Sequence, residues 1–414
     1  MPPRLNPAIA QLRCSLSGRE LPASTFSSPV GLCPCCPRPG KPLVVEYDGA
    51  AVRAALVDGA FPAAPGAGIW RYGPLLPVLD VPAGYAADVG LTATCRNASL
   101  SEECHVELFI KNEGTNPSGS FKDRGLAVAI ALGVACGATR FCLPTQGNAG
   151  VAACLFAARL GLPGILVYMP EGFQGSIYHR ACELFGGAVR FAGANIAAAA
   201  ARMRHDLRAL LERHEVVEVS TFFEPGRLEG KKTMGLEIAE HFGPTNLPEF
   251  IVYPTGGGTG LVGIWKAFRE LVELGLVERR RLPRLVAVQS ERCAPVVAAF
   301  RAGFDTVEPV TSRGTIADGL DVPGAIMGHA MLRALRESEG TAITVSEEAI
   351  LAAFRSLGRA GVGASYEAAA TLAALLELRR TGVAGLGARA LLLATASHLV
   401  ALARTQVVGA PAPG

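Results

Sequence analysis

The feature that most constrains the fold of this chain is a regular alternation of helical and strand patterns from about residue 120 onward. Residues 121–137, FKDRGLAVAIALGVACG, have the apolar spacing of a helix, and residues 139–145, TRFCLPT, have the pattern of a buried strand. Residues 195–215, NIAAAAARMRHDLRALLERHE, predict one long helix, which the strand VVEVS follows. The alternation continues through EFIVYPT, GLVGIWKAFRELVELG and RLVAVQS. Helices that connect successive strands produce βαβ units, so we expect an α/β fold with mostly parallel sheets.

The composition argues against several classes of function. Half of the 414 residues are hydrophobic and 18% are charged, which is typical of an enzyme with large buried sheets and helices. The formal net charge is +3 without a dense run of Lys or Arg, so we expect no nucleic-acid partner.

No apolar stretch reaches the roughly 18–20 residues of a membrane span. The N-terminus, MPPRLNPAIAQLRC, does not have the pattern of a signal peptide. The eleven cysteines are scattered, which is typical of a reducing compartment, so we expect a cytoplasmic protein without a membrane partner.

The N-terminal segment has a different pattern, with LRCSLSGRE followed by GLCPCCPRPGKPLVVEYD. Cys33 and Cys36 have the CxxC spacing of a zinc knuckle, and Cys14 lies upstream. A four-ligand site would need a cysteine where Ser17 stands, and Cys35 could replace it only with poor geometry. We therefore favour a ribbon-like arm without a metal, and zinc remains the alternative.

The first candidate motif is NPSGSFKDRG, at residues 116–125. Its first residues favour a turn, and Ser118 and Ser120 are good helix N-caps, so Lys122 is predicted in the first turn of a helix. A cation opposes the helix dipole at that position, which suggests that the lysine has a chemical purpose. Positive potential from the helix start and from Arg124 favours a neutral amine that can attack an aldehyde.

Two further motifs lie where predicted strands end and helices begin. TQGNAG (145–150) places Asn148 at the carboxyl end of a strand, where parallel α/β sheets bind ligands, although Asn148 could simply cap the helix. PTGGGTG (254–260) has adjacent glycines whose backbone N–H groups can surround an anion at a helix start. The same loop satisfies GxGxxG, but the next strand, RLVAVQS, ends in Gln289 and Ser290 rather than in an acidic residue. A nicotinamide dehydrogenase is therefore disfavoured.

A helix-start lysine, a polar Asn loop and a phosphate loop are together typical of a pyridoxal phosphate site. The aldehyde of this cofactor needs a lysine amine, its phosphate needs a glycine-rich loop, and its ring needs fixed hydrogen bonds. We therefore predict pyridoxal 5'-phosphate as the cofactor.

At this point the sequence resembles the threonine synthase branch of the fold type II (tryptophan synthase β-like) pyridoxal phosphate enzymes. The motifs that carry the resemblance are NPSGSFKDRG, TQGNAG, FFEPGRLEGKKTMGLEI, PTGGGTGLVGIWKAF, TIADGLDVP and TASH, and they span roughly residues 12–400. The resemblance implies two doubly wound, mostly parallel-sheet domains with a small N-terminal ribbon-like arm. We expect the arm at 1–48, a large cofactor-binding domain at 49–125 and 222–405, and a small domain at 126–221. The resemblance also implies a homodimer.

The resemblance also implies roles for individual residues. Lys122 is the expected Schiff-base residue and catalytic base, and Asn148 is expected to hold the phenolic oxygen of the cofactor. Thr395, with Ser397 in reserve, is expected at the pyridine nitrogen. The expected phosphate-binding residues are Gly256, Gly257, Gly258, Thr259 and Gly260, and the expected substrate-binding residues are Gln146, Gly147 and Arg227.

Two departures from the family pattern affect the expected activity. TASH places Ala396 and His398 where the family has glycines, and His398 could act as an acid or base or could be structural. The family has a second phosphate site, which binds the phosphate group of the substrate. Around the expected position of this site, Ala149 and Phe222 stand where hydroxyl or amide donors are usual, so few other side chains could bind the phosphate together with Arg227.

The expected function is that of a pyridoxal-phosphate-dependent carbon–oxygen lyase that converts O-phosphohomoserine to threonine and phosphate. The altered second pocket keeps open a threonine or serine dehydratase, or a β-replacement enzyme acting on another β-substituted amino acid. A third hypothesis, motivated by TASH, is a homologue that binds its ligand without turnover. Intact SFKDRG, GNAG and GGGTG motifs argue against that hypothesis.

Overall fold

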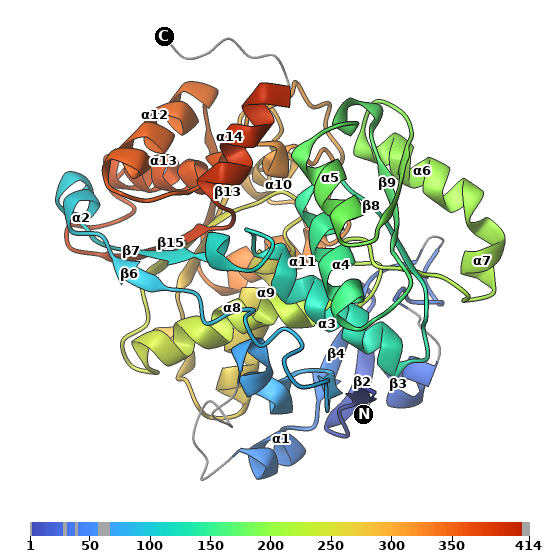
Figure 1. Ribbon diagram of the computed structural model, residues 1–414. Coiled ribbons are helices and arrows are strands. Elements are labelled where there is room, and N and C mark those ends of the chain that lie inside the picture. The colour runs from blue at the N-terminus through green and yellow to red at the C-terminus, as the bar shows by residue number, and fades with distance from the viewer. Residues whose placement is uncertain (1, 28–30, 38–39, 57–66, 408–414) are drawn as a thin grey trace. The chain divides into compact units, whose positions relative to one another are not determined.

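The computed structural model describes residues 2–27, 31–37, 40–56 and 67–407 (Figure 1). These residues belong to two compact units. Unit 1 comprises residues 1–90, 122–233 and 403–414, and unit 2 comprises residues 91–121 and 234–402. The α/β prediction is confirmed, because each unit contains its own mostly parallel sheet. The expected boundaries of the arm, the large domain and the small domain stay a prediction.

Unit 1 contains a four-stranded parallel sheet with the order β10-β9-β8-β11. Its strands are β8 (Phe141–Pro144), β9 (Leu166–Met169), β10 (Ala188–Phe191) and β11 (Val217–Glu218). Its connecting helices are α4 (Asn148–Arg159), α5 (Ile177–Leu184), α6 (Ile196–Asp206) and α7 (Arg208–Glu212). Figure 1 shows α4 and α5 on one side of β8 and β9 and α6 on the other. The sheet is therefore doubly wound, with the strand order reversing between β8 and β11.

The prediction of one long helix over 195–215 is wrong, because the helix breaks at Leu207. Leu207 leaves the helical conformation, with φ −103° and ψ 10°. Its side chain is buried in a cluster with Cys142 and Tyr168, against which Leu210 also packs. Burial of these leucines against the sheet outweighs the local preference for an unbroken helix.

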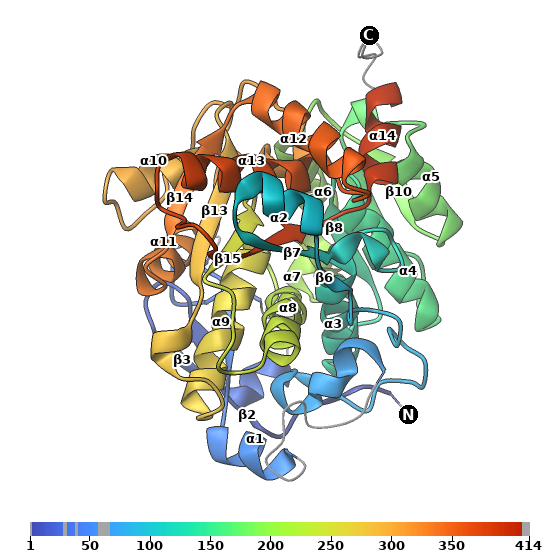
Figure 2. The ribbon, with the colours of Figure 1, turned by 90° about the vertical axis from the view of Figure 1, so that its left-hand side faces the viewer.

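Unit 2 contains a six-stranded sheet with the order β14-β13-β12-β15-β7-β6, in which only the β6–β7 pair is antiparallel. Its strands are β6 (Thr94–Arg96), β7 (Glu107–Asn112), β12 (Phe250–Pro254), β13 (Arg284–Ser290), β14 (Thr341–Val345) and β15 (Arg389–Ala394). Every residue of β12 is buried, as expected for a central parallel strand that is covered on both faces. Figure 2 shows α12 and α13 on one side of β13 and β15 and α9 on the other.

The helices of unit 2 bury their apolar faces on this sheet. They are α2 (Ala98–Cys104), α9 (Thr259–Glu273), α10 (Pro295–Arg301), α11 (Gly328–Glu337), α12 (Glu347–Arg359) and α13 (Tyr366–Arg380), with the 3-10 turns η4 (Glu113–Thr115), η6 (Arg279–Arg281) and η7 (Asp318–Leu320). Helix α13 packs against four strands of the sheet, and its residues Ala369, Leu372 and Leu375 are almost completely buried. This packing fixes the ends of β12 and β15 relative to the start of α13.

The described residues of the N-terminal part of unit 1 form two small antiparallel sheets. Strands β2 (Ile9–Cys14), β3 (Glu20–Pro22) and β4 (Leu43–Tyr47) form one, and β1 (Arg4–Leu5) pairs with β5 (Val78–Leu79) in the other. The remaining elements are α1 (Gly49–Ala55), α3 (Lys122–Ala135), α8 (Gly226–Phe242), α14 (His398–Val407) and the 3-10 turns η1 (Ala23–Ser27), η3 (Gly68–Leu75) and η5 (Glu171–Phe173). Among the described residues, none of the helices has the length and apolar character that crossing a membrane requires.

Candidate active site

The predicted glycine-rich loop lies between β12 and α9 in unit 2, as the sequence indicated. Gly258 is the N-cap residue of α9 and has a left-handed conformation with φ +73°. The first hydrogen bond of the helix runs from the N–H of Val262 to the carbonyl oxygen of Gly258, at 3.1 Å. The N–H groups before Val262 therefore lie outside the helical hydrogen-bond ladder, at the positive end of the helix dipole. This is the arrangement that binds an anion at a helix start.

Close packing explains why three positions of this loop are glycine. A Cβ atom at Gly256 would lie 2.0 Å from the carbonyl oxygen of Gly319, and one at Gly258 would lie 1.9 Å from Sδ of Met331. A Cβ atom at Gly260 would lie 2.1 Å from the hydroxyl oxygen of Tyr253. All three distances are too short for a Cβ atom, so a side chain would displace the loop from the Gly319 backbone at Gly256 and would force the loop or the facing side chain to shift at Gly258 and Gly260.

Thr395 and Ser397 follow β15, the neighbour of β12 in the sheet, and they meet the turn that precedes Lys122. The N–H of Phe121 donates to the carbonyl oxygen of Thr395 at 2.9 Å, and the N–H of Ser397 donates to that of Gly119 at 3.0 Å. The ring of Phe121 packs edge-on against the ring of Tyr253, with centroids 6.4 Å apart. Since Tyr253 also underlies Gly260, unit 2 brings the glycine-rich loop, the end of β15 and the turn before Lys122 together.

The turn itself rests on buried charged groups that the sequence analysis did not identify. Nδ2 of Asn116 donates to the carbonyl oxygen of Glu113 at 2.8 Å and to its Oε2 at 3.0 Å. The other carboxylate oxygen of Glu113 accepts from the hydroxyl of Thr92 at 2.7 Å. Nζ of Lys111 donates to Oε2 of Glu237 at 2.7 Å. A buried, hydrogen-bonded carboxylate thus fixes the conformation of the NPSGS turn.

Two more residues that the sequence analysis missed lie at the start of α13. The hydroxyl of Ser365 is buried and has no hydrogen-bond partner among the described residues, while its backbone N–H donates to the carbonyl oxygen of Ala396 at 3.1 Å. Oε1 of Glu367 accepts from the N–H of Gly319 at 2.9 Å, and Gly319 packs against Gly256. The Ser-Tyr-Glu sequence before an apolar helix is the signal that could have pointed to both residues.

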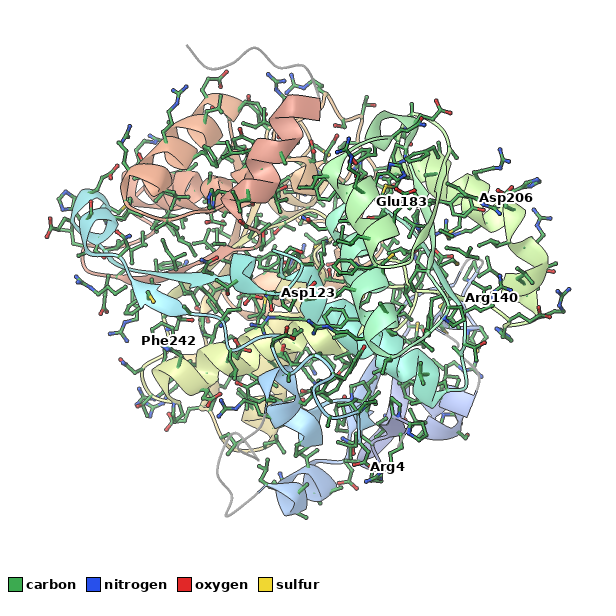
Figure 3. All side chains as sticks on the ribbon, in the orientation of Figure 1. Arg4, Asp123, Arg140, Glu183, Asp206 and Phe242 are labelled. Carbon is green, nitrogen blue, oxygen red and sulfur yellow. The ribbon has the colours of Figure 1, made fainter. Side chains whose placement is uncertain are left out.

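In unit 1, Lys122 is the first residue of α3 and is half-buried, which confirms its predicted place in the first helical turn. Asp123, labelled in Figure 3, is fully buried. Arg124 is also fully buried, and its Nη1 donates to the hydroxyl of Thr233 at 2.9 Å. The residues around Lys122 are thus fixed by interior packing.

Asn148 is the first residue of α4, directly after the loop that follows β8, and is half-buried. Gly147 has φ +140°, and a Cβ atom there would lie 2.8 Å from the ring of Tyr178. The hydroxyl oxygen of Thr145 accepts from the N–H of Gly147 at 3.0 Å and from that of Gly150 at 3.1 Å. Gln146 lies half-buried between these anchored positions, so the loop presents Gln146, Gly147 and Asn148 in a fixed conformation.

Arg227 is the second residue of α8 and is only 2% exposed. Its Nη1 donates to the carbonyl oxygen of Val219 at 2.9 Å, whereas its Nε has no hydrogen-bond partner among the described residues. Burial lowers the pKa of Arg227 to about 10, although the charge of Glu224 opposes this shift. Burial also raises the pKa of Glu224 to about 7. A buried guanidinium with an unused N–H group is suited to an anionic partner.

The helix that begins with Lys122 packs directly against the helix that carries Arg227. A Cβ atom at Gly125 would lie 3.0 Å from the carbonyl oxygen of Arg227. One at Gly230 would lie 1.9 Å from the carbonyl oxygen of Arg124. Glycine at both positions lets the two backbones approach, so the start of α3 and the start of α8 are held together within unit 1.

The departures from the family pattern have plain structural descriptions. Phe222 is buried with φ +65°, an unusual conformation for a bulky residue. Ala149 is half-buried in the first turn of α4. His398 is exposed, and its Nδ1 would lie 2.4 Å from a Cβ atom at Gly363, so its ring packs on that glycine.

The sequence contains six lysines, and three of them already hold carboxylates. Lys111 pairs with Glu237 at 2.7 Å, Lys232 pairs with Glu229 at 2.7 Å, and Lys266 pairs with Glu270. Lys41, Lys122 and Lys231 are the other lysines of the chain.

The chain is similar to a known protein family, to curated proteins and to solved structures. Residues 86–396 match the family described as "Pyridoxal-phosphate dependent enzyme". A threonine synthase of Methanosarcina acetivorans is 32% identical over 312 residues, which cover 75% of this chain and 74% of that protein. A threonine synthase of Methanocaldococcus jannaschii is 29% identical over 313 residues, covering 75% of each. Among solved structures, a threonine deaminase of T.th. is 25% identical with a TM-score of 0.60, covering 74% of this chain and 92% of that one. Maize serine racemase, at 20% identity, has a TM-score of 0.63 and covers 77% of this chain and 92% of that one.

Proposed function

Because the chain belongs to the pyridoxal-phosphate-dependent enzyme family, we propose that it acts as a threonine synthase, which eliminates phosphate from O-phosphohomoserine and adds water to give threonine. The family membership confirms the predicted cofactor and the predicted enzyme class. The choice of substrate rests on the buried guanidinium of Arg227, whose unused Nε suits a phosphate dianion. The similarity to threonine synthases over three quarters of the chain supports the same choice.

The residues of the glycine-rich loop fit the phosphate group of the cofactor. Gly256, Gly258 and Gly260 leave no room for side chains on the packed face, and the N–H groups at the start of α9 supply donors without a cation. We assign the phosphate to the N–H groups of this loop, including those of Gly257 and Thr259. The fit depends on the chemistry of the donors and on the crowding around the glycines.

We assign the ring of the cofactor to three other positions. Asn148 is the proposed donor to the phenolic oxygen, since it is half-buried and fixed at the start of α4. Thr395 is the proposed partner of the pyridine nitrogen, with Ser397 in reserve. The unpartnered hydroxyl of Ser365 is a further candidate, because its backbone bonds to Ala396 beside Thr395. A hydroxyl partner leaves the ring nitrogen largely unprotonated, which suits elimination better than transamination.

Lys122 is the proposed attachment point of the cofactor and the proposed base. Its place at a helix start, beside the buried Arg124, favours the neutral amine that this task requires. With the substrate bound, the amine of Lys122 would take the proton from the α carbon. The chemistry that pyridoxal phosphate would supply here is delocalisation of the electron pair left on the α carbon. Gln146 and Gly147 are the proposed holders of the substrate's carboxylate, close to the N-terminus of α4.

One observation favours a second function, that of a threonine or serine dehydratase. Ala149 and the buried Phe222 offer no hydrogen bond to a substrate phosphate, and Glu224 places a carboxyl group near Arg227. A substrate without a phosphate would not need further donors. The fold similarity to a threonine deaminase is compatible with this alternative.

One pair of assays separates the two functions. The purified holoenzyme is given O-phosphohomoserine, and inorganic phosphate and threonine are measured; in parallel it is given threonine, and 2-oxobutyrate is measured. A threonine synthase releases phosphate and threonine in equal amounts, and a dehydratase produces 2-oxobutyrate instead. Arg227→Gln is expected to raise the KM for O-phosphohomoserine by more than about tenfold, since it removes a charged contact with the phosphate. Failure of the wild type to release phosphate would exclude the first proposal.

We also propose a homodimer in the cytoplasm. The scattered thiols support a reducing compartment, and the family resemblance supports the dimer. Light scattering on the purified protein tests the oligomeric state.

A further inference from the structure

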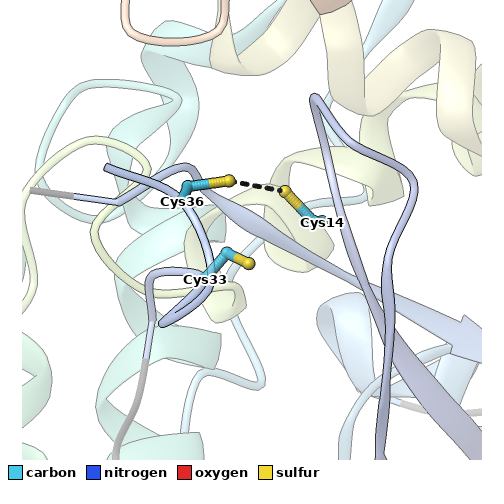
Figure 4. A group of neighbouring side chains, drawn as sticks. All are labelled: Cys14, Cys33 and Cys36. Carbon is cyan, nitrogen blue, oxygen red and sulfur yellow. Dashed lines mark hydrogen bonds between the residues drawn. The ribbon is translucent and has the colours of Figure 1, made fainter. Parts of the chain in front are cut away.

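Three cysteines of the N-terminal arm lie together although 22 positions separate the first from the last. Cys14 ends β2, while Cys33 and Cys36 belong to the loop that precedes β4, the neighbour of β2. Their Sγ atoms all lie within 4.8 Å of one another, and those of Cys14 and Cys36 are 3.5 Å apart (Figure 4). Cys14 and Cys33 are buried and Cys36 is half-buried, whereas Cys35 is exposed and lies outside the cluster.

We propose that Cys14, Cys33 and Cys36 bind one zinc ion. Two sulfurs that bind the same tetrahedral zinc ion at about 2.3 Å lie roughly 3.8 Å apart. The Sγ–Sγ distances in the cluster, 3.5 Å for Cys14 and Cys36 and at most 4.8 Å for the other pairs, lie on either side of this value. Small side-chain rotations would therefore complete the site. A disulfide would need a sulfur–sulfur distance of about 2.05 Å and would leave the third thiol unused. Three convergent thiols, of which two are buried, are the soft ligand set that selects zinc.

The backbone around the cluster supports this assignment. The side-chain hydroxyl of Ser17 and the N–H groups of Ser17 and Leu16 hydrogen-bond to the sulfur of Cys14. The N–H of Cys35 hydrogen-bonds to the sulfur of Cys33. Donors of this kind can also hydrogen-bond to a zinc-bound sulfur and orient it. Ser17 occupies the position that a fourth cysteine would take, so its hydroxyl or a water molecule can complete the tetrahedron.

The zinc ion would fix a loop that touches the segment before Arg227. Gly31, two residues before Cys33, packs so tightly that a Cβ atom would lie 1.5 Å from the carbonyl oxygen of Phe223 and 2.6 Å from Cα of Glu224. The N–H of Cys33 donates to the carbonyl oxygen of Lys41 at 2.7 Å, and the N–H of Leu43 donates to that of Gly31 at 3.2 Å. The predicted role is therefore structural: zinc orders the arm against the start of α8.

The experiment uses the full-length holoenzyme. After extensive dialysis, metal analysis is expected to find about one zinc ion per chain. Replacement by Co(II) is expected to give the absorbance of thiolate-to-cobalt charge transfer together with the bands of tetrahedral Co(II). Cys14→Ser, Cys33→Ser and Cys36→Ser should each lose the metal, whereas the matched control Cys35→Ser, beside two of the ligands, should keep it. The cofactor absorbance shows whether each variant has folded.

A gain-of-function variant keeps the proposal testable even if the cysteine variants fail to fold. Ser17→Cys completes a four-thiolate set, so it should hold zinc at a chelator concentration that strips the wild type, and its Co(II) charge-transfer absorbance should increase. Removal of zinc should also speed amide exchange at residues 31–37 and 223–227, because Gly31 contacts Phe223 and Glu224. A wild type without zinc, a different metal in its place, a Cys14–Cys36 disulfide found by peptide mapping, or unchanged metal retention in Ser17→Cys would each overturn the proposal. None of these results depends on catalytic activity.

Discussion

The backbone N–H of Phe121 donates to the carbonyl oxygen of Thr395 at 2.9 Å, so the residue before Lys122 is bonded directly to the end of β15. A second hydrogen bond, from the N–H of Ser397 to the carbonyl oxygen of Gly119, joins the same two segments. The residue that we assign to the pyridine nitrogen and the turn that leads into the proposed catalytic lysine therefore cannot move independently. This backbone link explains how a flexible lysine side chain can be presented from a fixed point.

The first prediction concerns Gly258. Gly258→Ala should weaken the binding of pyridoxal phosphate by about tenfold, because the new Cβ atom would lie 1.9 Å from Sδ and 2.8 Å from Cγ of Met331, so the loop and the Met331 side chain must move apart. The control is Gly275→Ala. Gly275 follows the same helix with φ +74°, and a Cβ atom there would meet nothing within 4 Å. It shares the strain of positive φ, about 1 kcal/mol, without the clash. Titration of the apoenzyme with the cofactor measures the affinity of each variant. Equal cofactor affinities for Gly258→Ala and Gly275→Ala would contradict the assignment of the phosphate to this loop.

The second prediction concerns Glu367, which holds the turn that packs on Gly256. Glu367→Ala should weaken cofactor binding by about tenfold, since the N–H of Gly319 would lose its partner and the turn would move. Glu367→Gln should restore most of the affinity, because an amide oxygen can accept the same bond. Glu377→Ala, which removes a surface ion pair with Arg380 on the same helix, should leave the affinity unchanged. An affinity in Glu367→Ala equal to that of the wild type would show that the turn does not support the loop.

The third prediction separates function from stability at Ser365. A buried hydroxyl without a partner costs about 1–3 kcal/mol, so Ser365→Ala should raise the free energy of unfolding of the apoenzyme by about 1 kcal/mol while weakening cofactor binding. Ser338→Ala is the matched control. The hydroxyl of Ser338 is buried, donates to the carbonyl oxygen of Leu335 and accepts from the N–H of Leu285, so its loss should destabilise the protein and leave cofactor affinity unchanged. Urea unfolding and cofactor titration provide the two measurements. A less stable Ser365→Ala apoenzyme would refute the interpretation.

The fourth prediction concerns the pH dependence of stability. Burial raises the pKa of Glu224 from 4.5 to about 7, so the folded protein holds a proton between these values that the unfolded chain has released. The stabilisation from this group is present below pH 4.5 and is lost as the pH rises through 7. The stability of Glu224→Gln relative to the wild type should therefore increase between pH 5 and pH 8, by up to about 3 kcal/mol.

Urea unfolding at several pH values measures this trend, and Glu215→Gln is its control. A hydrogen bond from Arg213 lowers the pKa of the exposed Glu215, so any pH dependence of that variant lies below pH 4.5. A difference between Glu224→Gln and the wild type that stays constant from pH 5 to pH 8 would mean that Glu224 is already ionised throughout.

The sequence predicted well where the candidate loops lie between strands and helices, because glycine and asparagine mark the places where strands end and helices begin. The glycine-rich loop lies between β12 and α9, and Asn148 opens α4, as their patterns indicated. These motifs are local, and local spacing is what a sequence shows directly.

Features that depend on distant contacts could not be predicted in this way. Ser365 and Glu367 are ordinary helix-start residues until the fold places them beside Ala396 and Gly319. The break at Leu207 depends on a core that the helix meets only in the folded protein. Cys14 meets the CxxC pair only because β2 pairs with β4, and a sequence does not show that pairing. From the sequence, the absence of a fourth cysteine favoured an arm without a metal.

We propose above all that pyridoxal phosphate is joined to Lys122. Borohydride treatment of the holoenzyme makes the link between the cofactor and its lysine permanent, and peptide mapping by mass spectrometry then identifies the labelled residue. We predict that only a peptide containing Lys122 carries the pyridoxyl group and that the Lys122→Ala variant carries none. A label on Lys41, on Lys231 or on any other lysine, or an unlabelled wild-type protein that has bound the cofactor, would contradict it.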